Sequence, residues 1–181
     1  MKLEDIIIQP VIETERFTLR PLRKSDEGLL NMHASDIRVA GNTTSIPHPL
    51  PPGSVEAIIA RARADDREED VWAMDGTKSG HAELLGVIAL KHLDRDQSEV
   101  SYWVAPAFWN TGLASEAVTA LLRSNPQDND TIFAQVFQDN PASARVLTNA
   151  GFKYLGDAET HSVARSANVP TWTYLIKLKQ G

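Results

Sequence analysis

Short segments in which apolar and polar residues alternate recur along the chain, as expected for strands with one buried face. The alternation is clearest from Phe17 onward in the first of them. The expected strands cover residues 11–20, 71–74, 84–90, 98–104, 131–137, 152–155 and 173–178. A loop of undefined shape is expected to join the last two strands.

Apolar residues at helical spacing fill several of the intervening segments. The expected helices follow Ser25-Asp26, which offers a cap, and begin at Ser54, Gly112 and Asn140. Met32 is expected to face the core from the first helix. The acidic run at 65–70 is expected to be the solvated end of the second helix. This order of elements predicts one mixed α+β domain over residues 1–181, built around a central sheet.

The loop that follows strand 98–104 carries a chemical signal. Residues 105–116 read A-P-A-F-W-N-T-G-L-A-S-E and lead into a helix. The first amides of a helix have no intrahelical acceptor, and together with the helix dipole they favour an anion such as phosphate. Gly112 lacks a Cβ where the backbone must approach a ligand. The amides concerned belong to Thr111, Gly112, Leu113, Ala114 and Ser115.

A second helix start, at Asn140–Ser143, follows the neighbouring strand. Ligands of open sheets bind where adjacent strands diverge at their carboxyl ends, so both helix starts are expected to border one cleft. Pro106 cannot continue a strand ladder and is expected to end the pairing and splay the strand. Glu116 is expected to pair with a neighbouring loop or to support the helix start.

Composition and charge narrow the function classes. The 181 residues include 18 Lys+Arg and 24 Asp+Glu, a net charge of −6, which argues against direct nucleic-acid binding and suits a cationic substrate such as an amine. The absence of cysteine excludes disulfides, thiolate nucleophiles and Cys-based zinc sites, and the five histidines show no metal-ligand spacing. No bound metal is therefore expected. Because neither a signal peptide nor a membrane-spanning stretch is evident, a cytoplasmic protein is expected.

Four segments in the right order resemble the Gcn5-related N-acetyltransferase (GNAT) superfamily, and within it the RimJ/RimL-like branch of ribosomal-protein N-terminal acetyltransferases. They are residues 13–22, 99–104, 108–117 and 140–152, so the resemblance covers most of the chain. It implies a single GNAT-like domain with a mixed, mostly antiparallel, splayed sheet and about four helices. It also implies acetyl-CoA as co-substrate, with its pyrophosphate on the amides of residues 110–115 and its thioester carbonyl held by backbone N–H groups around Val104 and Ala105.

The chain departs from the family pattern in this loop. Glycine is usual where it has Asn110, and a basic residue or glutamine is common where it has Ala107. Asparagine adopts left-handed backbone conformations more readily than most residues, so the loop is still expected to form. Main-chain amides supply most anion contacts in such loops, so the missing cation at position 107 matters less.

Acetyl transfer to an amine requires a base that takes the proton of the attacking nitrogen. By resemblance Glu99 is the candidate base; the alternative is a structural glutamate on the sheet surface. Ser143 matches a serine that is a candidate acid toward the CoA sulfur, or it is a helix-start residue that bonds CoA. Asn140 is a helix cap, a contact to pantetheine or both, and Tyr102 and Tyr154 are further candidate acids.

The sequence thus predicts an N-acetyltransferase that acts by direct attack in a ternary complex. The acceptor is a primary amine, either a protein N-terminus or a small molecule, and segments 26–65 and 157–171 are expected to shape its site. His48, in the proline-rich loop at 41–53, is either a substrate contact or a solvated residue. The alternative function is a non-catalytic CoA-binding sensor or interaction module of the same fold. Monomer and homodimer are both compatible with the sequence.

Overall fold

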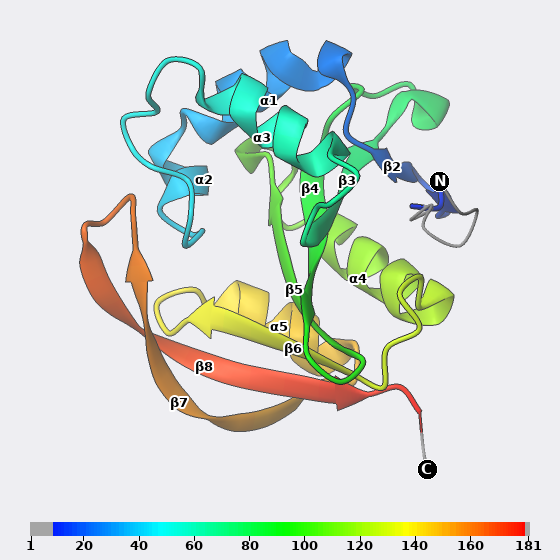
Figure 1. The fold of residues 1–181 in the computed structure, drawn as a ribbon, viewed down its shortest axis with the longest axis vertical. Coiled ribbons are helices and arrows are strands. Elements are labelled where there is room, and N and C mark those ends of the chain that lie inside the picture. Colours follow the sequence, from blue (N-terminus) through cyan, green and yellow to red (C-terminus); the bar gives the residue numbers. More distant parts are fainter. Residues whose placement is uncertain (1–8, 180–181) are drawn as a thin grey trace.

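The computed structural model describes residues 9–179, which form one eight-stranded sheet with helices on both faces (Figure 1). The strands are β1 (Ile12–Glu13), β2 (Thr18–Pro21), β3 (Glu69–Asp75), β4 (Gly86–Leu93), β5 (Gln97–Val104), β6 (Thr131–Phe137), β7 (Lys153–Ser162) and β8 (Ala167–Lys177). The helices are α1 (Glu27–Ala34), α2 (Ile37–Ala40), α3 (Ser54–Arg63), α4 (Leu113–Ser124) and α5 (Pro141–Asn149). The predicted α+β architecture with a mixed, mostly antiparallel sheet is confirmed.

The sheet runs in the order β1-β2-β3-β4-β5-β6-β8-β7, and all neighbours are antiparallel except β5 and β6. These two strands are parallel and pair only where residues 97–99 lie beside residues 131–133. Beyond this short junction the strands diverge, and Figure 1 shows β5 rising away from β6. The splay therefore begins well before Pro106, which only follows the end of β5, so the proline is not its cause.

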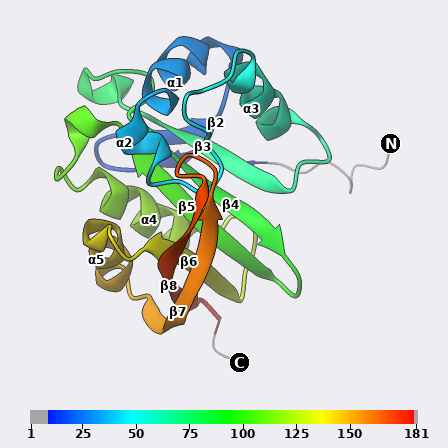
Figure 2. The same ribbon diagram turned by 90° about the vertical axis from the view of Figure 1, so that its left-hand side faces the viewer.

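Each face of the sheet buries its own apolar cluster. The larger one joins β2–β6 and β8 to α4 and α5, with Leu121, Ile132 and Leu147 almost fully buried. The other joins β3 and β4 to α1 and α3. Figure 2 shows α4 and α5 well separated from α1 and α3. Because side chains alternate along β5, Val100, Tyr102 and Val104 face α4 and α5, whereas Trp103 packs toward α1 and α3.

The C-terminal strands are much longer than their sequence predicted. A long hairpin, β7–β8, replaces the two short strands and the undefined loop, with a register shift between Tyr154 and Gly156. β7 is an edge strand and is exposed along most of its length, so its residues do not alternate between buried and solvated positions. Pro170 lies within β8, and a proline at this position makes the segment resemble a loop in the sequence. The hairpin sweeps from the lower edge of the molecule to α2 (Figures 1 and 2).

Three other expectations about the N-terminal half need correction. Asp26 stands at the N-cap position of α1, as expected, but its side chain does not cap the helix; it is fully buried and accepts two hydrogen bonds from the guanidinium of Arg20. The run 65–70 is not a solvated helix end, because α3 stops at Arg63 and Asp70 is buried within β3 against Arg67. Met32 is exposed rather than in the core. The partners in these two ion pairs are only six and three residues apart, but the hydrophobic pattern does not distinguish a buried ion pair from solvated charges.

Candidate functional site

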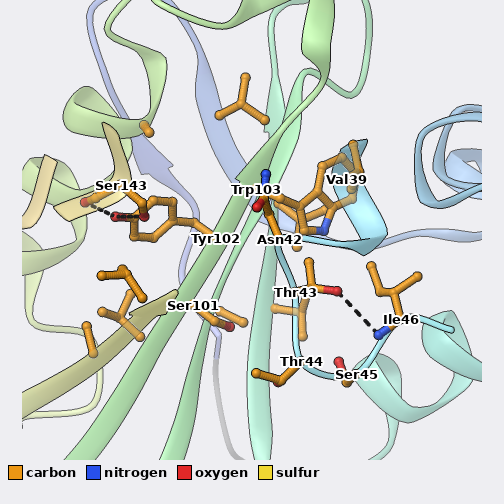
Figure 3. A pocket seen from close by; sticks show the side chains of 18 of the residues that line it. Val39, Asn42, Thr43, Thr44, Ser45, Ile46, Ser101, Tyr102, Trp103 and Ser143 are labelled. Carbon is orange, nitrogen blue, oxygen red and sulfur yellow. Dashed lines mark hydrogen bonds between the residues drawn. The ribbon is translucent and has the colours of Figure 1, made fainter. Parts of the chain in front are cut away.

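A cleft of about 1180 Å³ opens where β5 and β6 diverge. β5 runs through its middle and divides it into two sides (Figure 3). The amide side holds residues 110–115, Tyr102 and Ser143. The hydroxyl side holds residues 42–46 and Ser101, together with Glu99, which lies two residues from Ser101 and therefore on the same face of β5. Figure 3 shows Tyr102 and Ser143 pointing toward each other on one side of β5, and residues 42–46 on the other.

The loop before α4 presents a row of backbone donors. Asn110 and Gly112 both have left-handed backbones, with φ of +62° and +81°, and α4 begins one residue later, at Leu113. This confirms that asparagine supports the bend at position 110. Among residues 9–179, the amides of residues 110–115 donate to no protein acceptor. Such a row at a helix start binds anions and suits a pyrophosphate.

An ion pair fixes this loop from behind. The Glu116 carboxylate accepts hydrogen bonds from Thr14 Oγ1 at 2.7 Å, Arg16 N at 2.9 Å and Arg16 Nε at 2.7 Å. The Arg16 guanidinium also donates to the Thr111 carbonyl at 2.9 Å. Burial raises the pKa of Glu116, but these hydrogen bonds outweigh burial and lower it below its ordinary value. Glu116 therefore pairs with a neighbouring loop, as expected, and supports the helix start.

The start of α5 carries the second polar group of the amide side. Asn140 caps the helix by accepting from the Ser143 amide at 3.4 Å, with Pro141 in the first turn, as predicted. The Ser143 hydroxyl donates to the Tyr102 hydroxyl at 2.9 Å, and the Tyr102 hydroxyl donates to the Ser143 carbonyl at 3.1 Å. Burial raises the pKa of Tyr102 to about 12, although the Ser143 hydrogen bond opposes it. Tyr102 is therefore a neutral phenol that holds Ser143 in place.

The end of β5 offers one main-chain donor rather than two. The Ala105 amide donates to the Leu85 carbonyl at 2.8 Å, and Ala105 does not line the cleft. Since bonding directions alternate in an antiparallel ladder, the Val104 amide points to the opposite edge, toward the gap left by β6. The Val104 carbonyl is fixed by Trp109 Nε1 at 2.7 Å.

Two carboxylates and an ammonium group lie in a row on the hydroxyl side. Glu69 pairs in register with Lys91 across β3 and β4, and Lys91 pairs with Glu99 across β4 and β5. Burial raises the pKa of Glu99 above its ordinary value, with Lys91 opposing the shift. Burial likewise raises the pKa of Glu69, where Lys91 lowers it and Glu99 raises it further. A carboxylate whose pKa is raised in this way is a better base.

Most residues singled out from the sequence meet in this cleft. The lining includes Glu99, Val104, Asn110, Thr111, Gly112, Leu113, Ala114, Ser115, Asn140 and Ser143. His48, Tyr154 and segment 157–171 do not line it. The sequence does not reveal Glu69, because this residue lies in the charged run 65–70, which predicts a solvated helix end. Only its position in register with Lys91 and Glu99 reveals its place in the cleft.

The described residues, 9–179, provide no cluster of three or more side chains suited to hold a metal ion. Among the helices formed by the same residues, none has the length and apolar character needed to cross a membrane.

Comparisons with known proteins agree with this geometry. Residues 16–153 match the acetyltransferase (GNAT) domain. The chain is 28% identical over 176 residues to the uncharacterized N-acetyltransferase YoaA of Bacillus subtilis, covering 92% of this chain and 96% of that protein.

Two solved structures share the fold at low sequence identity. Mycobacterium smegmatis RimJ, solved with CoA-disulfide, has a TM-score of 0.76 at 19% identity, covering 93% of this chain and 87% of that one. Spermidine N-acetyltransferase of Vibrio cholerae, solved with CoA and spermine, has a TM-score of 0.76 at 15% identity, covering 90% and 96%.

Proposed function

The chain belongs to the acetyltransferase (GNAT) domain family, and from this premise we propose that it acetylates a primary amine with acetyl-CoA, by direct attack in a ternary complex. The observation that carries the proposal is the row of amides at residues 110–115, which have no acceptor within the described part of the chain, beside a cleft that passes between β5 and β6. A phosphate-bearing donor on one side and an amine on the other would meet at β5.

The residues of the amide side fit acetyl-CoA, which when bound supplies an acetyl group on a thioester. The amides of residues 110–115 would hold the pyrophosphate, with Arg16 and Glu116 keeping their loop in shape. The Val104 amide would donate to the thioester carbonyl oxygen, where negative charge develops. Asn140 and Ser143 would contact the pantetheine arm. Ala105 drops out of this set as a donor, because its amide is already bonded to Leu85.

Glu99 is the proposed general base. The attacking amine must lose a proton as its nitrogen bonds to the acetyl carbon and the carbon–sulfur bond breaks. The raised pKa of Glu99 and its place on the hydroxyl side support this role. The Ser143 hydroxyl, which Tyr102 orients, would turn from Tyr102 to the released thiolate and pass it a proton, and it would regain a proton from water.

The acceptor is proposed to be a protein N-terminal α-amine, as in the RimJ/RimL-like branch, or a small-molecule amine. Hydroxyl groups of Thr44, Ser45 and Ser101 line the hydroxyl side and can bond a polar acceptor. The structural relatives include RimJ and a spermidine acetyltransferase, so both acceptor classes belong in the same screen.

The donor site is tested by thermal unfolding with acetyl-CoA, CoA and ATP in parallel. Ligand binding to the folded state stabilises it by about 2.7 kcal/mol at a hundredfold excess over Kd. A shift with acetyl-CoA and none with ATP supports the proposal, whereas no shift at millimolar acetyl-CoA overturns it. Binding without acetylation of any peptide or small amine would instead favour the non-catalytic sensor.

The base is tested with Glu99→Gln on the best acceptor found. The wild-type kcat/KM should rise with pH as Glu99 loses its proton, because only the carboxylate accepts a proton. Glu99→Gln should lower the rate by roughly 10²- to 10⁴-fold and abolish that limb of the profile. Glu159→Gln, an exposed glutamate on β7, is the matched control. An unchanged pH profile in Glu99→Gln would place the base elsewhere.

A further inference from the structure

Arg165 joins two segments that lie far from it and from each other in the sequence. Its Nε donates to the Gly41 carbonyl at 2.8 Å, directly after α2. Its terminal nitrogens bind both carboxylate oxygens of Asp139, at 2.5 and 3.1 Å, in the turn that follows β6. The guanidinium also lies over the Phe137 ring, 4.6 Å from its centroid. We refer to Arg165 with Gly41, Phe137 and Asp139 as the Arg165 clasp.

The rest of the β7–β8 hairpin tip docks at the same place. The Val163 amide donates to the Thr44 carbonyl at 3.2 Å. Ala164 packs against the small buried cluster of Ala34, Ala40 and Ile46. Figures 1 and 2 both show the tip of this hairpin beside α2. The hairpin is therefore anchored on residues 41–46 by main-chain, apolar and charged contacts together.

The two segments held by the clasp form opposite walls of the cleft. Gly41 immediately precedes residues 42–46, which line the hydroxyl side. Asp139 lies between Phe137 and Asn140, which both line the cleft, and Asn140 caps the helix that carries Ser143. Arg165 itself does not line the cleft. The guanidinium of Arg165, which lies behind both walls, therefore fixes the distance between residues 42–46 and the start of α5.

We propose that Arg165 is a positioning residue, which sets the spacing between residues 42–46 and the start of α5 and so aligns the acceptor amine with the donor. This inference rests on the proposed function, because it assigns the hydroxyl side to the acceptor.

The clasp needs the chemistry of arginine. Its planar fork bonds a carboxylate with two nitrogens while the third reaches a carbonyl, which a single ammonium group cannot reproduce. The hydrogen bond from Arg165 lowers the pKa of Asp139, with burial opposing the shift, so the carboxylate is ionised near neutral pH. The guanidinium also stacks on Phe137, whose ring is buried.

The test compares Arg165→Ala and Arg165→Lys with the wild type and with Arg123→Ala, an exposed arginine at the end of α4 that does not line the cleft. Three quantities are measured: the Kd for CoA, the KM and kcat for the acceptor, and hydrogen exchange of residues 41–46. Both Arg165 variants should lower kcat/KM for the acceptor roughly ten- to a hundredfold. The CoA Kd should stay within about twofold, because the segments assigned to CoA keep anchors of their own: Arg16 holds residues 110–115, and the Asn140 cap and Tyr102 hold the start of α5. The wall that is freed is residues 41–46.

Hydrogen exchange separates this inference from the proposed function. Faster exchange at residues 41–46 in both variants is expected, whether or not an acceptor has been found. Unchanged exchange and unchanged acceptor KM would overturn the positioning role, as would full activity in Arg165→Lys. Loss of CoA binding in parallel with the acceptor effect would also overturn it, since that result means general damage. A wild type that acetylates nothing refutes the proposed function and with it the acceptor alignment, whereas exchange still reports on the clasp.

Discussion

Replacement of Glu116 by glutamine should destabilise the protein and weaken the loop before α4. Glutamine keeps one oxygen for the Thr14 hydroxyl and the Arg16 amide, but it places an NH₂ group against Arg16 Nε, which is itself a donor. The loss is one charge-assisted hydrogen bond, about 1.5–3 kcal/mol. The Arg16 side chain is 42% exposed and regains water, so an overall cost of about 2 kcal/mol is expected.

Urea unfolding at pH 7 measures this cost directly, with Glu159→Gln as the control for loss of a charge. In thermal unfolding a cost of about 2 kcal/mol corresponds to a lower Tm by about 4–8 °C for a chain of this size. A difference below about 0.5 kcal/mol between the two variants would refute the reasoning, because surface substitutions alone give that much. The CoA-induced rise in Tm should also be smaller in Glu116→Gln, since Arg16 no longer holds Thr111 as firmly.

The same variant gives a pH test with a defined sign. The pKa of Glu116 is lowered in the folded state, so its contribution is fully present above the unfolded value of 4.5. It is lost as the pH falls through the lower, folded value. The stability gap between wild type and Glu116→Gln should therefore be constant near neutral pH and shrink below about pH 4.5. A gap that widens on acidification would contradict the assignment.

Two further sets of substitutions test the amide side. Asn110→Gly should leave the acetyl-CoA-induced rise in Tm intact. Asn110→Val should lose this rise, because a β-branched residue is a severe outlier at a φ of +62°. Equal rises in Tm in both variants would contradict this prediction. Tyr102→Phe and Ser143→Ala should each lower kcat about tenfold, and the double variant should be no slower than the slower single variant, because the two hydroxyls act as a unit. Steady-state kinetics at saturating acetyl-CoA measures this, and multiplicative losses would show that the hydroxyls act separately.

Locally encoded parts of the site could be predicted from the sequence. The cap at Asn140 and the left-handed bend at Asn110 depend on backbone preferences of single residues, and both were confirmed. Gly86 is a local signal of the same kind, because a glycine inside a strand suggests a close approach of another backbone. A Cβ there would lie 2.4 Å from the Trp103 carbonyl oxygen.

The parts that were missed depend on contacts that only the folded chain makes. Glu69 enters the cleft through its register with Lys91, and Asp26 is buried against Arg20, which also binds Asp75, 55 residues away from it in the sequence. Residues of the β7–β8 hairpin do not alternate between apolar and polar along its edge strand, so the sequence does not indicate how long the hairpin is. Arg165 carried no signal in the sequence, because Gly41 and Asp139 come to it through the fold.

The short parallel junction between β5 and β6 also shapes the mechanics of the molecule. The ladder between β5 and β6 is limited to residues 97–99 and 131–133. Beyond it, the parts before and after the junction are joined by side-chain packing, including that of α4 on α5, and by the docked tip of the β7–β8 hairpin. A molecule seated in the cleft would touch both parts at once and act as a brace between them. The binding energy of a substrate would then also stabilise the two parts against moving relative to each other. The protein would be most rigid when its substrates are bound.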